Sequence, residues 1–535
     1  MRIRLLLIPL ALVAGSCSGR SPGLTSKSSK TIATQPSQSA PPATDFTAQT
    51  DPPLDTTFDT IAPADTINTI DTVAPVDTAD PNDPFGFISC DTGVDCGHLS
   101  VPIDYTDPGA GSFSIYVAVH RATDQANKLG SLLVNPGGPG FGGSDFAFFA
   151  EQVYGEKILK NFDIVAWDPR GTGQSEPAID CVDDYDRYFA ANDITPDDAT
   201  ERQQIIDLAK EFEDFCSTKN ADILQFIGTN NSARDMDSIR QALGEDKITY
   251  FGFSYGSELG ATWATLFPDT VRAAVLDGAA DPNSNLLEGG LQQIAGFEAS
   301  VATFLKNCSD TPDCAFNNGG DAAGAFDKLM LALDDKAVPS SLDRPDVNRG
   351  VALVAVSEAM YSKTTWPELE QALADAQKGD GAGLLSLYDQ YFQRGADGVY
   401  DNSLEAFQTI SCMDTVDRAT VAEDDATAPQ FNQAAPRMGA GTTGSYFCTF
   451  FPTPNDPRVT ITGAGAGPIV VVGTTGDPAT PLASSENMAK ALEQGIMLIG
   501  VADQHTAYGT STCIDDAIEG YLVDLTVPKS GTRCE

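Results

Sequence analysis

Short apolar runs recur along two stretches of the chain, and helix-compatible segments separate them. Nearly every position in these runs is apolar, which is typical of strands buried on both faces of a parallel sheet. The strands expected from this pattern are residues 132–134, 162–167, 248–251, 273–276, 468–473 and 496–501. The alternation predicts an α/β protein, with a mostly parallel central sheet and helices on both faces.

The spacing of apolar residues becomes helical between residues 286 and 454. This stretch interrupts the succession of expected strands and is longer than one core domain needs. We therefore expect a mainly helical cap inserted into a core made of residues 85–285 and 455–535. The helices expected in the cap are residues 287–306, 322–335, 352–361, 367–378 and 384–394.

The first residues predict export. Arg2 and Arg4 precede an apolar run at residues 5–13, which is too short to span a membrane as a helix, so residues 1–16 resemble a secretory signal. Ala14-Gly15-Ser16-Cys17 is similar to a lipoprotein processing site, at which Cys17 would be lipidated and would anchor the protein to a membrane. Ordinary cleavage and release into the medium is the alternative.

Residues 17–84 are rich in Ser, Thr, Pro and Asp and contain almost no aromatic residues. Such a composition cannot bury enough apolar surface to fold, so we expect a disordered acidic stalk. The formal net charge of −43 argues against nucleic-acid binding, because proteins that bind nucleic acid are basic. It fits a solvated surface, or a mild attraction for cationic substrates.

The cysteine count agrees with export. Of eleven cysteines, ten remain once Cys17 is set aside, and ten can all form disulfides. Spacing cannot fix connectivity, but closeness along the chain favours five pairs: Cys90–Cys96, Cys181–Cys216, Cys308–Cys314, Cys412–Cys448 and Cys513–Cys534.

The pentapeptide Gly252-Phe253-Ser254-Tyr255-Gly256 joins an expected strand to an expected helix. A turn this tight strains the residue at its apex and exposes its hydroxyl, while the glycines allow close backbone approach. We therefore interpret Ser254 as a nucleophile rather than as part of a glycine-rich turn. A serine nucleophile needs a base to take its proton.

The chain has three histidines: His98, His120 and His505. His98 lies in a cysteine-rich segment and His120 in an apolar strand, where a structural role is expected. His505 lies in a polar loop just after the run 496–501, a common place for a functional residue. We therefore expect His505 to be the base. No spacing typical of a metal site is present, and we expect neither a metal nor a cofactor.

The base needs a carboxylate to hold its tautomer. Asp477 directly follows the buried run 468–473, and one helix and one strand separate it from His505. Asp277, after the run 273–276, is the competing candidate, but it could equally cap the next turn, so we rank Asp477 first. The order Ser, Asp, His along the chain is that of α/β-hydrolases.

Two further turns complete the expected site. Residues 135–143 form a glycine-rich loop after a strand, which would let backbone N–H groups reach the oxygen of a substrate, and the N–H of Tyr255 would be a second donor. Asp168 and Arg170 follow the strand 162–167, and we expect them to organise that turn rather than to react.

Taken together, these motifs resemble the prolyl and tripeptidyl aminopeptidase family of α/β-hydrolases, in particular its secreted actinobacterial tripeptidyl aminopeptidase branch. The resemblance implies Ser254 as nucleophile, Asp477 and His505 as its partners, and Gly138 with Tyr255 as oxyanion donors. Glu258 and the loop 503–506 differ from the family pattern. The segments that carry the resemblance are residues 135–140, 168–175, 233–237, 252–256, 276–278 and 410–414, with Asp477 and His505.

Three functions fit these features. The first is a serine peptidase with a cap over its pocket, which removes residues or short peptides from free N-termini. The second is a carboxylic-ester hydrolase with the same triad, and the third a catalytically silent binding protein of the cell envelope. For the first, Asp414 and Glu298 are candidates to bind the substrate ammonium; oligomeric state is not predicted.

Overall fold

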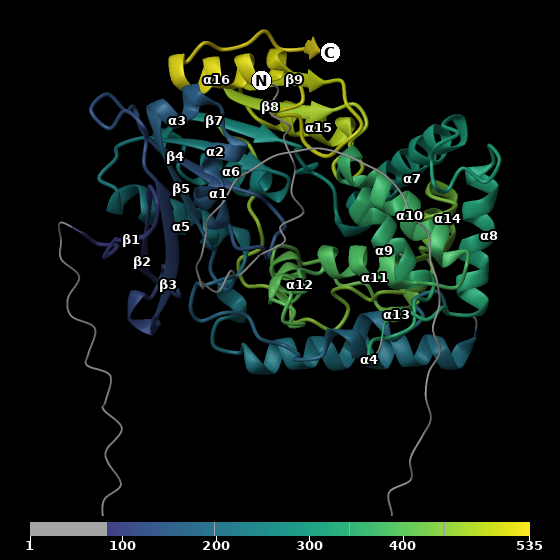
Figure 1. The fold of residues 1–535 in the computed structure, drawn as a ribbon. Coiled ribbons are helices and arrows are strands. Elements are labelled where there is room, and N and C mark those ends of the chain that lie inside the picture. Colours follow the sequence, from purple (N-terminus) through teal and green to yellow (C-terminus); the bar gives the residue numbers. More distant parts are fainter. Residues whose placement is uncertain (1–82, 197, 342, 442–443) are drawn as a thin grey trace, which may run out of the picture. The chain divides into compact units, whose positions relative to one another are not determined.

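A sheet of ten strands forms one side of the part of the chain that the structure describes, and a cluster of helices lies beside it (Figure 1). This computed structural model describes residues 83–196, 198–341, 343–441 and 444–535. The predicted signal, nearly all of the predicted stalk and Cys17 lie outside these residues. Across the sheet the strands are β1 (Ile88–Asp91), β2 (Val94–Pro102), β3 (Ser112–His120), β5 (Phe162–Trp167), β4 (Gly130–Asn135), β6 (Ile248–Phe253), β7 (Val271–Asp277), β8 (Ile469–Thr474), β9 (Gly495–Gly500) and β10 (Thr532–Cys534).

The sheet is mostly parallel, as predicted. All pairings from β5 through β4, β6, β7, β8 and β9 to β10 are parallel. The three pairings that join β1, β2, β3 and β5 are antiparallel. Because the carboxyl ends of β6, β7 and β8 meet at one edge of the sheet, residues that follow these strands come close together.

Helices precede, connect and follow these strands. They are α1 (Asp145–Phe148), α2 (Ala150–Val153), α3 (Glu156–Asn161), α4 (Ala199–Lys219), α5 (Thr229–Ala242), α6 (Tyr255–Leu266), α7 (Leu286–Asp310), α8 (Ala322–Asp335), α9 (Arg349–Met360), α10 (Trp366–Ala376), α11 (Ala382–Tyr391), α12 (Ser403–Met413), α13 (Val421–Asp425), α14 (Ala428–Ala434), α15 (Leu482–Ala491) and α16 (Thr512–Asp524). Within the described chain, no helix is both long and apolar enough to cross a bilayer.

Alternate residues of the central strands pack into two separate cores, one on each face of the sheet. Leu133 packs with Met236 of α5 and Trp263 of α6. Its neighbour Val134 packs on the opposite face with Ile518 of α16. Covering both faces explains why the central strands are apolar at every position, and it confirms the predicted fold class.

The five helices expected between residues 286 and 454 are present as α7 to α11, and they share a third core of their own. One long helix was not predicted. α4 lies between β5 and β6 along the chain, and it runs beside α12 and α13 (Figure 1), with Arg202 of α4 bound to Asp425 of α13. Few of its residues are buried, so its apolar stripe is weak. The domain boundaries stay a prediction.

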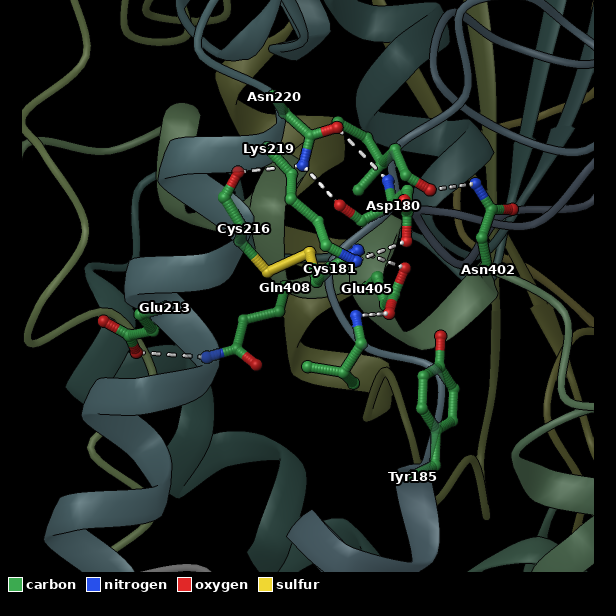
Figure 2. Close-up of a disulfide and its surroundings, with 12 residues drawn as sticks. Asp180, Cys181, Tyr185, Glu213, Cys216, Lys219, Asn220, Asn402, Glu405 and Gln408 are labelled. Carbon is green, nitrogen blue, oxygen red and sulfur yellow. Dashed lines mark hydrogen bonds and ion pairs between the residues drawn. A yellow bond between two sulfur atoms is a disulfide. The ribbon is translucent and has the colours of Figure 1, made fainter.

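All five predicted disulfides are present. They are Cys90–Cys96, Cys181–Cys216, Cys308–Cys314, Cys412–Cys448 and Cys513–Cys534. The disulfide Cys412–Cys448 starts within α12, and Figure 2 shows the surroundings of Cys181–Cys216. Closeness along the chain was therefore a sufficient guide to connectivity in this protein.

Candidate active site

Ser254 sits at a strained turn between β6 and α6. Its backbone has φ 55° and ψ −126°, a combination that non-glycine residues rarely adopt, and such strain costs about 1–3 kcal/mol. The two flanking glycines make the turn possible: a Cβ at Gly252 would lie 2.3 Å from the carbonyl oxygen of Gly256, and one at Gly256 would lie 2.6 Å from that of Asn135. Strain at the apex of a turn that two glycines make possible favours a functional role for this turn.

His505 is held by Asp477. Its Nδ1 lies 2.9 and 3.0 Å from the two carboxylate oxygens of Asp477, and both residues are buried. Asp477 also accepts the backbone N–H groups of Ala479, Thr480 and Thr506. The carboxylate is thereby fixed, and it fixes the orientation and the tautomer of the imidazole.

Asp277 has a different task. Its carboxylate accepts the backbone N–H groups of Ala507 at 2.9 and 3.0 Å and of Tyr508 at 2.8 Å, so it anchors the loop that follows His505. Burial raises the pKa of Asp277 to about 7. Since the contacts to the imidazole nitrogen come from Asp477, the geometry supports the ranking of the two acids made from the sequence.

Ser254 and His505 lie at the same edge of the sheet. The N–H of Ser254 donates to the carbonyl of Asp277 at 2.8 Å, and the next residue, Gly278, lies against the imidazole: a Cβ there would be 3.1 Å from Cε1 of His505. The Nε2 of His505 is buried and has no hydrogen-bond partner among the described residues. A ring nitrogen in this state can accept the proton of a nucleophile.

Electrostatics favour the charged imidazole. Burial opposes it, but the charge and hydrogen bond of Asp477 and the charge of Asp277 outweigh burial and raise the pKa of His505.

A residue that the sequence did not indicate completes the surroundings: the carbonyl of Tyr361 accepts the N–H of His505 at 3.0 Å, and its ring meets the imidazole edge-on at 5.4 Å. No sequence signal links Tyr361, just after α9, to this loop.

The glycine-rich loop lies against the turn of Ser254. A Cβ at Gly137 would be 2.7 Å from the Cβ of Ser254 and 3.0 Å from the backbone nitrogen of Tyr255. The N–H of Gly137 donates to Oδ1 of Asn135, whereas the N–H groups of Gly138 and Tyr255 have no acceptor in the part of the chain that is described. Both groups predicted as oxyanion donors are therefore available to a substrate.

Asp168 and Arg170 have the structural surroundings that were expected. Asp168 is buried and accepts the N–H groups of Ser144 at 2.9 Å and Gln174 at 2.8 Å, so it joins the glycine-rich loop to the turn after β5. Arg170 is fully buried in an ion pair with Asp235, with its Nη2 2.6 Å from Oδ1. Neither group is free to react with a substrate.

The two remaining histidines lie in strands β2 and β3. His98 lies within hydrogen-bond distance of the hydroxyl of Ser114, at 3.2 Å. His120 is buried, and its Nε2 lies 3.8 Å from a carboxylate oxygen of Glu151. Among the described residues, no group of three potential ligands could hold a metal ion.

Neither acid suggested as an ammonium-binding group is free. Asp414 is bound by Thr229, with its Oδ1 2.7 Å from the backbone nitrogen. Glu298 accepts the N–H of Arg437 at 2.9 Å. Glu258, which differs from the family pattern, forms an ion pair with Arg458. We therefore withdraw Asp414 and Glu298 as candidates for that role.

Comparison with known proteins fits this geometry. Residues 130–317 match the model of the alpha/beta hydrolase fold family, and residues 435–534 match that of the TAP-like proteins. The serine protease Hip1 of Mycobacterium tuberculosis is 35% identical over 466 residues, which cover 83% of this chain and 87% of that protein. The chain belongs to the tripeptidyl aminopeptidase-like family of α/β-hydrolases.

Other members of the family have different names. Carboxylesterase B of Mycobacterium tuberculosis is 37% identical over 459 residues, 82% of this chain and 86% of that protein. Tripeptidyl aminopeptidase of Streptomyces coelicolor is 27% identical over 445 residues, 80% of this chain and 81% of that protein. The resemblance drawn from the motifs is confirmed, and this family member is an enzyme of the hydrolase class.

Proposed function

We propose that this hydrolase is a serine peptidase that removes residues or short peptides from free N-termini. The observation that carries the proposal is His505, whose Nδ1 is held by both oxygens of Asp477 while its Nε2 has no partner among the described residues. Ser254, the expected nucleophile, lies on a strained turn at the same edge of the sheet as His505.

The reaction would follow from these groups. Nε2 of His505 takes the hydroxyl proton of Ser254 as Oγ attacks the substrate carbonyl carbon, and the carbonyl electron pair moves to the oxygen, which the N–H groups of Gly138 and Tyr255 stabilise. The imidazolium then gives its proton to the leaving amine as the C–N bond breaks. Water repeats the sequence on the acyl-enzyme and frees the serine.

Glu358 supports a preference for free amino termini. It lies on α9 one turn before Tyr361, and hence on the same side of the helix, and Tyr361 contacts the imidazole. Its carboxylate has no ion-pair or hydrogen-bond partner in the described chain, and burial together with the charge of Glu368 raises its pKa to about 7. A largely buried carboxylate without a partner is stabilised by a cation, such as a substrate ammonium.

A carboxylic-ester hydrolase with the same triad is the second candidate, since carboxylesterase B is among the relatives. The test compares purified enzyme on peptide anilides with a free amino terminus, on their acetylated forms and on short acyl esters. We expect the free peptides to be cleaved at least about tenfold faster than the acetylated forms. Equal rates on both peptides would refute the preference for free termini, and activity on esters alone would establish an esterase instead.

Labelling tests the nucleophile independently of the substrate. A fluorophosphonate should modify Ser254, and Ser254→Ala should lose at least about a thousandfold in rate, because members of a triad act as a unit. A fully active Ser254→Ala enzyme would refute the mechanism.

We further propose that the enzyme is exported and anchored at Cys17. Five disulfides support an oxidising compartment.

A further inference from the structure

Helix α12 touches the glycine-rich loop. A Cβ at Gly140 would lie 2.4 Å from the backbone nitrogen of Phe407 and 2.4 Å from the carbonyl oxygen of Ser403, so the loop backbone rests directly on the backbone of the helix. Gly140 is two residues beyond Gly138, one of the two proposed oxyanion donors. Any movement of α12 would therefore be transmitted to this side of the oxyanion site.

The other side of the site is connected to the end of the same helix. The hydroxyl of Tyr255 lies 2.5 Å from Oγ1 of Thr229, and this Oγ1 donates to Oδ2 of Asp414 at 2.5 Å. Asp414 directly follows α12, and its Oδ1 accepts the N–H of Thr229 at 2.7 Å. Because an ionised carboxylate can only accept, Thr229 donates to Asp414, and Tyr255 donates to Thr229.

A partly buried ion pair reinforces this connection. Glu258, one turn after Tyr255 in α6, binds the guanidinium of Arg458, and the N–H of Arg458 donates to the carbonyl of Asp414 at 2.9 Å. Two residues in the first turn of α6 are thus tied to Asp414. This accounts for Glu258, the position at which the sequence differs from the family pattern.

α12 is itself held in place along its length. Glu405 accepts the N–H groups of Cys181 at 2.9 Å and of Val182 at 2.7 Å (Figure 2). One turn later Gln408 donates to the buried carboxyl group of Glu213 at 3.2 Å (Figure 2). The disulfide Cys412–Cys448 ties α12 itself to the segment around Cys448, and Cys181–Cys216 ties the segment that Glu405 binds to α4. A helix secured in this way can serve as a rigid reference for both donors.

We propose that Thr229 and Asp414 are positioning residues of the oxyanion site: through the hydroxyl of Tyr255 they hold the first residue of α6, and hence its backbone N–H, at a fixed place relative to the glycine-rich loop on α12. The inference rests on the proposed function, because it concerns the donors of that reaction. It also gives Asp414 a role in place of the ammonium-binding role that the structure excludes.

Conservative substitutions test the proposal. Removing an oxyanion donor outright typically costs about 10²–10³ in kcat, so a donor that is merely loosened should cost about tenfold. We expect Thr229→Val and Tyr255→Phe each to lower kcat about tenfold while KM changes less than about twofold, and their double variant to lose no more than either alone. Thr229→Ser keeps the hydroxyl and should keep wild-type kcat.

A transition-state analogue separates positioning from general loss of structure. A peptide trifluoromethyl ketone forms a hemiketal oxyanion with an active serine, so its affinity for Thr229→Val should fall in proportion to kcat/KM. Thr262→Val is the matched control: Thr262 lies in the same helix α6 and is fully buried, and its hydroxyl has no partner among the described residues. This control should keep both kcat and inhibitor affinity.

The possible outcomes distinguish this inference from the proposed function. If the wild-type enzyme is active and Thr229→Val and Tyr255→Phe keep its kcat and inhibitor affinity, the positioning role is refuted and the proposed function stands. If Thr262→Val loses as much as Thr229→Val, the loss reflects packing of α6, which also refutes the role. If the wild-type enzyme hydrolyses neither peptide nor ester and Ser254 is not labelled, the proposed function fails, and this inference with it.

Discussion

The two carboxylates near His505, Asp477 and Asp277, should respond very differently to replacement by an amide. In Asp477→Asn, the amide oxygen can still accept the N–H groups of Ala479 and Thr480, as Oδ1 of Asp477 does now. The amide NH2 would then face Nδ1 of His505 and stabilise the tautomer that carries its proton on Nε2. That tautomer cannot take the proton of Ser254.

The expected loss is large. A wrongly held tautomer lowers kcat by about 10⁴, which corresponds to about 5 kcal/mol of lost transition-state stabilisation. The fold should survive, because most bonds made by the buried carboxylate have an equivalent in the amide. Initial rates on the preferred substrate give kcat and KM, and circular dichroism with thermal melting confirms that the variant is folded.

Asp277→Asn is the matched control. Asp277 contacts the backbone of Ala507 and Tyr508 rather than the imidazole, so kcat should stay within about tenfold of the wild-type value. Its negative charge raises the pKa of His505, and removing that charge should lower this pKa. Because the base must be neutral to act, the acid limb of the kcat/KM profile should shift to lower pH. An inactive Asp277→Asn with a normal Asp477→Asn would show that the acid was wrongly assigned.

Three further predictions concern stability, substrate and anchoring. Burial raises the pKa of Glu213 from 4.5 to about 9, so its contribution to stability is lost as pH rises from 4.5 to 9. Glu213→Gln should therefore be more stable than wild type by about 3 kcal/mol at pH 7 and nearly equal to it at pH 4.5. A variant that is less stable than wild type at pH 7 in urea titrations would show that Glu213 is ionised. Glu358→Gln should reduce the preference for free over acetylated peptides at least about fivefold. Glu368 is an exposed acid that a glutamine side chain binds, and Glu368→Gln should leave this preference unchanged. An unchanged ratio in Glu358→Gln would show that Glu358 does not bind the substrate. Cys17→Ser should move the protein from the membrane fraction to the medium, and persistence in the membrane fraction would argue against a lipid anchor.

The predictions that succeeded rest on local features of the sequence. Apolar runs identified the central strands because a strand covered on both faces has no polar side. Helices α7 to α11 were visible because apolar residues recur in them at helical spacing, whereas α12 to α14 in the same stretch were not predicted. The strained turn at Ser254 could be found because it needs glycines at fixed positions on both sides. The five disulfides could be paired because each joins cysteines that are close along the chain.

Other features depend on contacts between residues far apart in sequence, and these only the tertiary structure decided. Asp277 and Asp477 both follow buried strands, and only the folded loop shows which of them reaches Nδ1 of His505. Helix α4 escaped prediction because most of its surface is polar. Asp414 was suggested as an ammonium-binding acid because it is a carboxylate of the predicted cap; its partner Thr229 lies 185 positions earlier in the chain. Sequence patterns thus indicated the candidate reactive groups, whereas only the packing showed which residues hold these groups in place.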